Sequence, residues 1–156
     1  MIVLGIDPGL SGGVAVVDSR SMEIVIGMRV PVFKWRTKKL IDVPVLHDFL
    51  SGVSIDTAVI ENVGSMPGQG HVGAFTFGRA TGAIEGLAML LTPKVEWVTP
   101  QKWKKHFGLS KDKQASIDTA KKIFGDSYRW QFKADDGIAE AALMARWLLD
   151  QRAKMG

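Results

Sequence analysis

The chain has 156 residues, of which 46% are hydrophobic, and this favours one globular domain spanning residues 1–156 with a sizeable core. The absence of cysteine excludes disulfides, thiolate zinc sites and cysteine nucleophiles, and a net charge of +4 gives weak support for an anionic partner. No apolar run reaches the roughly 20 residues of a membrane helix, and Met1 leads directly into an apolar run without a charged leader. We therefore expect a cytoplasmic protein without membrane contacts.

The first half of the chain begins with three short apolar runs, at residues 1–6, 12–18 and 23–30. The spacers between them are short and rich in small residues, which favours hairpins, so these runs are predicted to form three antiparallel strands. Residues 40–50 have helical spacing, although Pro44 weakens that interpretation. Residues 57–61 follow as a central strand.

The second half is predicted to be mainly helical. A glycine-rich loop precedes a long helix over residues 74–91, in which glycine recurs at every fourth position, at Gly78, Gly82 and Gly86. Because glycine weakens helices, such a row indicates close approach to another backbone, and tight packing of the helix on the sheet is the favoured explanation.

The remaining predicted elements follow in chain order. They are a fifth strand over residues 94–98, a short helix over 100–106, an amphipathic helix over 111–124 and a mostly buried final helix over 135–153.

Acidic residues occur where predicted strands end and where the final helix begins. Asp7 ends the first strand, Glu61 ends the central strand, and Asp135, Asp136 and Glu140 open the last helix. A carboxylate at the end of a buried strand is costly to desolvate unless it is paired or binds a cation, so the combination suggests a metal centre.

Each acid also has a structural interpretation. Asp7 could form a turn with the Pro-Gly that follows it, and Asp136 and Glu140 could complement the helix dipole. Asp136 and Glu140 are four residues apart and share a helix face, whereas Asp135 is rotated by about 100° and is favoured as the N-cap. Glu61 follows an apolar run that is expected to be buried on both faces, where a glutamate has no ordinary packing role.

Two segments combine basic and aromatic side chains. Residues 29–39 contain no acid and include Phe33 and Trp35, and residues 94–113 interleave Trp97, Trp103 and His106 with six lysines. Cations neutralise phosphates and aromatic rings stack on bases, so both segments suit a nucleic acid. The alternative is a solvated face with partly buried tryptophans.

Four motifs of the chain resemble those of a known family. It has Ile-Asp-Pro-Gly at residues 6–9, Val-Ile-Glu at 59–61, a glycine-rich loop before a glycine-spaced helix, and Asp-Asp-Gly-Ile-Ala-Glu-Ala at 135–141. Actin-like ATPases share the first motif, but the order of all four resembles the RuvC-type Holliday-junction resolvases, especially their short phage-encoded versions. A phage-encoded protein would work in the host cytoplasm.

The resemblance implies an α/β protein with an RNase H-like fold, in which helices flank both faces of a five-stranded mixed sheet. It also implies a homodimer that cuts opposite strands of four-way or otherwise branched DNA, using two Mg²⁺ ions per active site, with Mn²⁺ able to substitute. Asp7 and Glu61 match the first two catalytic acids. The family's last two acids are usually three residues apart, so the choice of metal ligands among Asp135, Asp136 and Glu140 stays open.

The resemblance also implies where DNA would bind. Lys113 resembles a basic residue that approaches the scissile phosphate, and Gly64 stands where cellular members carry a stacking aromatic residue, which shifts that role to Met66 or His71. A basic hairpin or loop around residues 34–39 would contact one arm of the junction. The further lysines and arginine expected to contact the DNA backbone are Lys34, Arg36, Lys38, Lys39, Lys102, Lys104, Lys105 and Lys111.

The predicted function is that of a crossover junction endodeoxyribonuclease in recombination and DNA repair. The alternative is a non-catalytic protein that binds branched DNA with the same fold. An actin-like ATPase would need a second half and a second phosphate loop, for which 156 residues leave no room, so no nucleotide cofactor is expected.

Overall fold

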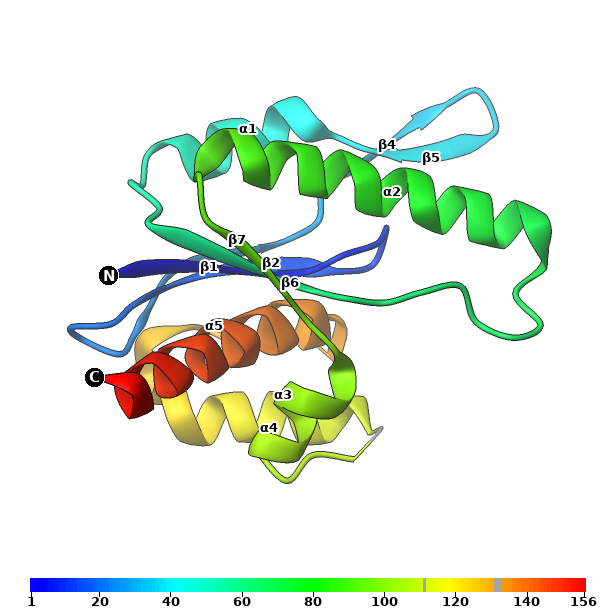
Figure 1. Ribbon diagram of the computed structural model, residues 1–156. Coiled ribbons are helices and arrows are strands. Elements are labelled where there is room, and N and C mark those ends of the chain that lie inside the picture. Colours follow the sequence, from blue (N-terminus) through cyan, green and yellow to red (C-terminus); the bar gives the residue numbers. More distant parts are fainter. Residues whose placement is uncertain (111, 131–132) are drawn as a thin grey trace.

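A five-stranded mixed sheet forms the centre of the protein in the computed structural model, which describes residues 1–110, 112–130 and 133–156 (Figure 1). The strand order is β3-β2-β1-β6-β7. The five strands are β1 (Ile2–Asp7), β2 (Gly13–Asp18), β3 (Ile24–Arg29), β6 (Thr57–Glu61) and β7 (Val95–Val98).

The pairing of the strands combines a meander with a parallel half. β1 runs antiparallel to β2, and β2 antiparallel to β3, whereas β6 lies parallel to both β1 and β7. The prediction of three antiparallel strands at the start of the chain is therefore confirmed, as is the mixed sheet. All five residues of β6 are buried, as expected for a strand that is covered on both faces.

Helices cover both faces of this sheet (Figure 1). α1 (Val43–Ser51) and α2 (Gly70–Leu91) pack over one face, while α3 (Pro100–His106), α4 (Lys113–Phe124) and α5 (Asp136–Met155) lie on the other. Two short 3-10 turns, η1 (Gly125–Ser127) and η2 (Lys133–Asp135), connect α4 to α5. Within the described residues, none of the helices combines the length and apolarity that a bilayer crossing requires.

The starts of α1 and α2 differ from the sequence-based expectation. Pro44 does not interrupt α1, because it falls in the first turn, where proline is tolerated, and Asp42 caps the helix by accepting a hydrogen bond from Val45 N at 3.2 Å. α2 begins at Gly70, four residues before the predicted start, so part of the expected loop is helical.

The glycine row of α2 does not pack on the sheet, so that prediction was wrong. Gly78, Gly82 and Gly86 are exposed, and a Cβ atom added to any of them would meet nothing within 4 Å. The helix instead buries the opposite side, with Ala80, Ile84, Leu87 and Ala88. The glycine row therefore forms an open strip on the outer surface.

Close contact between backbones occurs on the other face, beneath α5. A Cβ atom on Gly5 of β1 would lie 1.8 Å from the carbonyl oxygen of Ala141, and one on Gly137 would lie 2.6 Å from the carbonyl carbon of Gly12. These distances are too short for any side chain, so glycine is required at both positions. The first turns of α5 are thereby held directly against the central strands.

A separate two-stranded hairpin precedes α1. It consists of β4 (Val32–Trp35) and β5 (Lys38–Ile41), and Figure 1 shows it projecting beside α2. The predicted alternatives for this segment were a hairpin or a loop, and the hairpin is what forms.

Candidate metal centre

Two of the predicted acids leave the sheet side by side. β1 and β6 are parallel, and Ile6 lies opposite Ile60, so the next residues, Asp7 and Glu61, emerge at the same edge. Glu61 is only 7% exposed, at the end of a fully buried strand. The topology thus brings together two carboxylates that are more than fifty residues apart in the chain.

α5 supplies a third carboxylate to this edge. One oxygen each from Asp7, Glu61 and Glu140 lie within 4.8 Å of one another. Asp136 lies one turn before Glu140 on α5, close enough to Asp7 to raise its pKa through charge repulsion. Four acids from three elements therefore share one region, because the glycine contacts described above hold α5 against β1 and β2.

Crowding and burial disfavour the ionised form of Asp7. Its pKa is raised well above the ordinary value, first by burial and then by repulsion from Glu140, Glu61 and Asp136, while Lys104 acts in the opposite direction. Like charges gathered in a poorly solvated place are unfavourable unless a cation joins them. The electrostatics of the cluster thus favour a positively charged ligand.

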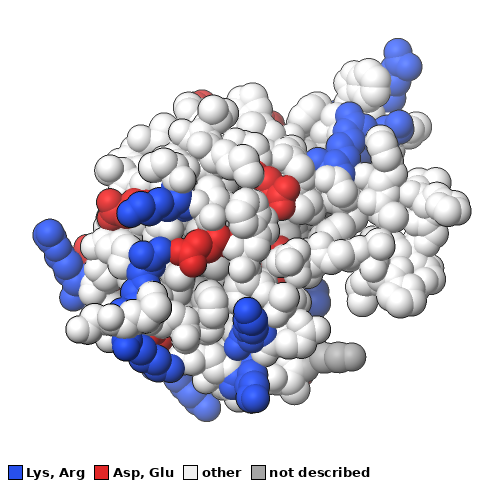
Figure 2. Space-filling model, in the orientation of Figure 1, with Lys and Arg blue, Asp and Glu red and all other residues white. Residues whose placement is uncertain are grey.

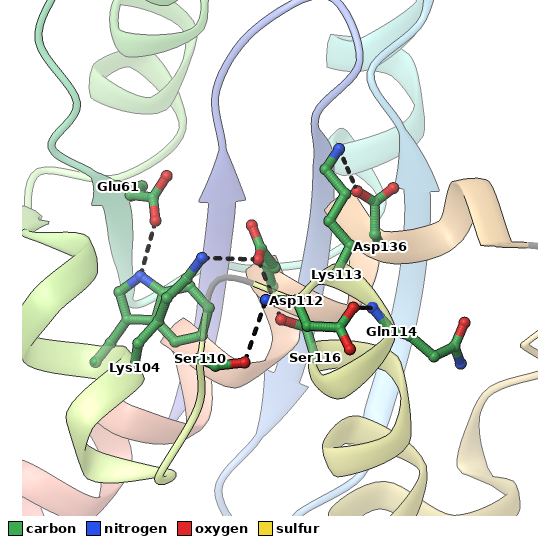
Figure 3. A network of polar contacts seen from close by, with 10 residues as sticks. Glu61, Lys104, Ser110, Asp112, Lys113, Gln114, Ser116 and Asp136 are labelled. Atoms are coloured by element: carbon green, nitrogen blue, oxygen red, sulfur yellow. Dashed lines mark hydrogen bonds and ion pairs between the residues drawn. The ribbon is translucent and has the colours of Figure 1, made fainter. Parts of the chain in front are cut away.

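Glu61 is held by a buried tryptophan. The indole Nε1 of Trp103 donates a hydrogen bond at 2.9 Å to Oε1 of Glu61, which is labelled in Figure 3. Trp103 itself is completely buried. Burial raises the pKa of Glu61, the Trp103 hydrogen bond lowers it, and Glu140 raises it further. One carboxylate oxygen is therefore fixed in place, while the other remains available to a ligand.

Two lysines neutralise part of the acidic cluster (Figure 3). Lys104 Nζ lies 3.1 Å from Glu140 Oε1, and Lys113 Nζ lies 2.8 Å from Asp136 Oδ2. Ser116 Oγ also donates to Glu140 Oε1 at 3.1 Å. The Lys113 side chain is 77% exposed and the hydrogen bond to Asp136 raises its pKa, so a charged, accessible ammonium group lies beside Asp136.

Asp135 has a different partner. It occupies the N-cap position of α5 but makes no side-chain capping hydrogen bond, so the predicted capping bond was wrong. Arg29 instead donates to Asp135 Oδ1 from Nε at 3.0 Å and from Nη2 at 2.9 Å. This ion pair ties β3 to the start of α5, and Asp135 is not part of the cluster formed by Asp7, Glu61 and Glu140.

Asp7 and Glu61 open into a cavity of about 420 Å³ that the loop after β6 helps to enclose. Asp7 and Glu61 line it together with residues 62–67 and with Phe77 of α2. Met66 projects from this loop with 74% of its surface exposed, and its backbone N donates to Gln69 Oε1 at 3.0 Å. His71 is exposed in the first turn of α2, outside the cavity lining.

The predicted DNA-binding lysines fall into two groups (Figure 2). Lys34, Arg36, Lys38 and Lys39 are exposed on the projecting hairpin, whereas Lys102, Lys104 and Lys105 belong to α3 next to the acids. Figure 2 shows blue side chains on the hairpin and over α3, with red acidic side chains and uncharged surface between them. The remaining predicted residue of this set, Lys111, lies outside the described residues.

The aromatic residues of the second basic segment are not a row of stacking platforms. Trp103 is in the core, Trp97 Nε1 donates to Glu85 Oε1 at 2.9 Å, and His106 Nε2 lies 2.8 Å from Asp150 Oδ2. The alternative of partly buried tryptophans describes this segment better. Trp97, at 43% exposed, retains some accessible surface.

Sequence reasoning missed the two side chains that support the acids, Trp103 and Ser116. Trp103 is the only large apolar side chain in the otherwise basic helix α3, and this was a signal that it must face the core. Ser116 carries no comparable signal, because a buried serine on an amphipathic helix usually bonds to its own backbone.

The side chains fit a divalent cation. Mg²⁺ and Mn²⁺ prefer carboxylate oxygens, and the cluster offers three that converge within 4.8 Å, with a fourth acid adjacent. Asp7 and Glu61 come from neighbouring strands, and Glu140 comes from a helix packed directly on them, so the three oxygens are held close together by the fold.

Together the sheet order and the flanking helices define an α/β protein with an RNase H-like fold and an acidic centre at the edge where β1 and β6 end. No family model and no curated protein sequence matches the chain. Two solved structures of RuvC from Thermus thermophilus, however, share its fold. One was solved in complex with a Holliday junction substrate; it is 19% identical, with a TM-score of 0.68, and the match covers 100% of this chain and 97% of that one.

The second structure, of Thermus thermophilus RuvC, has a TM-score of 0.69 at 19% identity, with 99% of this chain and 97% of that chain covered. The chain therefore has the fold of the RuvC-type Holliday-junction resolvases over its whole length.

Proposed function

We propose that the protein is a metal-dependent endonuclease that resolves Holliday junctions or related branched DNA by paired nicks. The observation that carries this proposal is the convergence of Asp7, Glu61 and Glu140 at the open edge of a RuvC-like sheet. Lysines beside the acids and on the projecting hairpin supply the positive surface that a DNA backbone needs. A protein with the same fold that only bound DNA would not need these mutually repelling buried carboxylates.

Each residue of the site has a role in this proposal. Asp7, Glu61 and Glu140 would hold Mg²⁺ or Mn²⁺, and Asp136 would complete the site for a second ion once Lys113 moves to a phosphate. Bound divalent ions would activate water and stabilise the leaving oxygen. Trp103 orients Glu61, while Lys104 and Ser116 orient Glu140.

The direct test is incubation of the purified protein with a synthetic four-way junction. In Mg²⁺ we expect nicks in two opposite strands at symmetric positions, with a linear duplex of the same sequence cut far less. Calcium or chelator in place of Mg²⁺ should leave binding without cleavage. Tight junction binding with intact DNA in both Mg²⁺ and Mn²⁺ would instead identify a non-catalytic branched-DNA-binding protein.

Removing the indole N–H of Trp103 is expected to slow cleavage. In Trp103→Phe a smaller aromatic ring remains in the core, and Glu61 loses the hydrogen bond that orients it and lowers its pKa. We expect a loss of about 10- to 100-fold, the range for residues that orient a metal ligand. The acid limb of the pH–rate profile should move to higher pH, because Glu61 must lose its proton to act.

The matched control is Trp97→Phe, which removes an indole N–H bonded to Glu85, a residue outside the cluster. It should leave the rate and the pH profile unchanged. A Trp103→Phe variant that cleaves at the natural rate would argue against orientation of Glu61 by the indole, and an unshifted acid limb would argue against its effect on the pKa of Glu61.

We also propose that the protein is a homodimer whose subunits meet at the glycine row of α2. Gly78, Gly82 and Gly86 form an outward strip with nothing within 4 Å of their Cβ positions, so another backbone could approach closely there. Met89, at 55% exposed, and Leu90, at 85% exposed, extend this face at the end of the helix. Paired nicks in opposite strands would follow from two symmetric active sites.

Gly82→Arg is expected to convert the dimer to monomer. Light scattering after size-exclusion chromatography should give twice the chain mass of 17.0 kDa for the natural protein and the chain mass for the variant. Ser51→Arg, on the exposed end of α1, adds the same side chain elsewhere and should remain dimeric. An unchanged mass for Gly82→Arg would exclude this interface.

A further inference from the structure

The hairpin β4–β5 and helix α2 enclose a groove that the metal centre does not use. Two adjoining cavities, of about 200 and 310 Å³, share Leu10, Lys39, Leu40 and Arg79 in their walls. None of the residues lining them lines the cavity above the acids. The groove is therefore a second concave surface, formed by a different part of the described chain.

The groove combines exposed aromatic rings with positive charge. Phe33 of β4 is 42% exposed and Phe75 of α2 is 67% exposed, and both lie in its walls. Lys38, Lys39 and Arg79 line the same groove, and none of its lining residues is acidic. Trp35, 49% exposed, lies on the same side of β4 as Phe33 because strand side chains alternate.

Two like charges face each other across the hairpin. Lys34 lies directly opposite Lys39 in the β4–β5 ladder, and like charges in that position destabilise a hairpin. Arg36 lies over the Trp35 ring at 4.9 Å, in the turn, with a backbone φ of 55° that is uncommon for residues other than glycine. Phosphate groups along the hairpin would relieve the repulsion between the two lysines.

Single-stranded DNA satisfies both features of the groove. Its phosphates would neutralise the lysines and Arg79, and its unpaired bases would present flat faces to Phe33 and Phe75. A duplex keeps its bases stacked on one another and offers only its phosphates. A second protein chain would leave the lysines without counter-charges unless it brought acids to the groove.

We propose that the groove between the hairpin and α2 binds an unpaired DNA strand, with bases against Phe33 and Phe75 and phosphates on Lys38, Lys39 and Arg79. The inference rests on the proposed function for its biological setting, because a branched substrate that opens at its centre exposes such a strand. It assigns substrate selection to the hairpin, separately from hydrolysis by the acids.

The test measures binding of a fluorescently labelled oligothymidylate of about 12 nucleotides, within the site size of one single-strand-binding domain. Fluorescence anisotropy in chelator separates binding from cleavage. We expect the natural protein to bind this strand more tightly than a duplex of equal length. The Phe33→Ala, Phe75→Ala double variant should bind it about tenfold or more weakly, since stacking on each base contributes substantially to affinity.

The charge variant gives an independent readout. Lys38→Gln with Lys39→Gln should reduce the slope of affinity against salt by about 0.7 for each lost phosphate contact, whereas the phenylalanine variant should keep the slope. Met155→Ala and Lys122→Gln are the matched controls, because both positions are exposed and lie outside the groove. Both should bind like the natural protein.

Failure of this inference is distinguishable from failure of the proposed nuclease. A protein that cuts junctions, but binds the single strand no better than the duplex or equally well with and without the two phenylalanines, overturns the groove assignment alone. A change from dimer to monomer in the phenylalanine variant would also overturn it, by showing that the groove holds a second subunit. If the protein binds the single strand through the groove but does not cut junctions, the groove assignment is supported and the proposed nuclease activity is contradicted.

Discussion

Asp7→Asn is expected to abolish DNA cleavage while leaving the fold intact. Metal ions supply several kcal/mol of stabilisation to the charge that develops during phosphodiester hydrolysis, and about 1.4 kcal/mol corresponds to a factor of ten in rate. Losing the carboxylate at the centre of the cluster should therefore lower the rate at least about a thousandfold. The measurement is single-turnover cleavage of a four-way junction in Mg²⁺.

The same substitution should stabilise the metal-free protein at neutral pH. The pKa of Asp7 is raised in the folded protein by burial and by the neighbouring acids, so its ionisation costs stability as the pH rises from the unfolded pKa through the folded one. Asparagine carries no charge and avoids that cost. In EDTA the variant should melt at a higher temperature than the natural protein at pH 7, with the difference disappearing in acid.

With added Mg²⁺ the natural protein should melt at a higher temperature than Asp7→Asn, because it gains stability by binding the ion and the variant gains less. Asp48→Asn on α1, an exposed carboxylate outside the cluster, is the control and should change neither cleavage nor the effect of Mg²⁺ on melting. If Asp7→Asn cleaves at the rate of the natural protein, Asp7 has no role in the mechanism.

Gly5→Ala is expected to have the largest effect on stability. Its Cβ would lie 1.8 Å from the carbonyl oxygen and 2.7 Å from the carbonyl carbon of Ala141, and backbone cannot move aside as a flexible side chain can. Helix α5 would have to shift away from β1. We expect a loss of at least about 3 kcal/mol in the free energy of unfolding, the upper end for overpacking, and a melting temperature roughly 10 °C lower.

The shift would also reach the site, because Glu140 immediately precedes Ala141. Displacement of a catalytic group by about 1 Å can cost about a hundredfold in rate, so any folded fraction of Gly5→Ala should cleave poorly. Gly52→Ala is the matched control, since that position has an ordinary φ of −74° and nothing within 4 Å of its Cβ. Chemical denaturation should give equal or slightly higher stability for the control. Equal melting temperatures for the two variants would contradict the close packing of α5.

Local patterns in the sequence indicated most of the elements and several residues of the site. Apolar runs with short spacers predicted the strands, and a glutamate after a fully apolar run predicted the buried carboxylate of Glu61. These predictions succeeded because burial and periodicity are properties of neighbouring residues. The glycine row of α2 had the same kind of local signal, but the sequence could not say whether the sheet or another surface lies opposite.

The sequence by itself determined which residues end the strands, which helix carries the late acids and where cations gather. Only the tertiary structure decided that Glu140 joins Asp7 and Glu61 and that Asp135 binds Arg29. It also decided that Trp103 is buried, away from the basic surface, where it donates a hydrogen bond to Glu61. The reason is that helical spacing fixes relative angles around one axis but not the rotation of that helix over the sheet. In this protein the rotation is set by backbone contacts at Gly5 and Gly137, between segments more than a hundred residues apart.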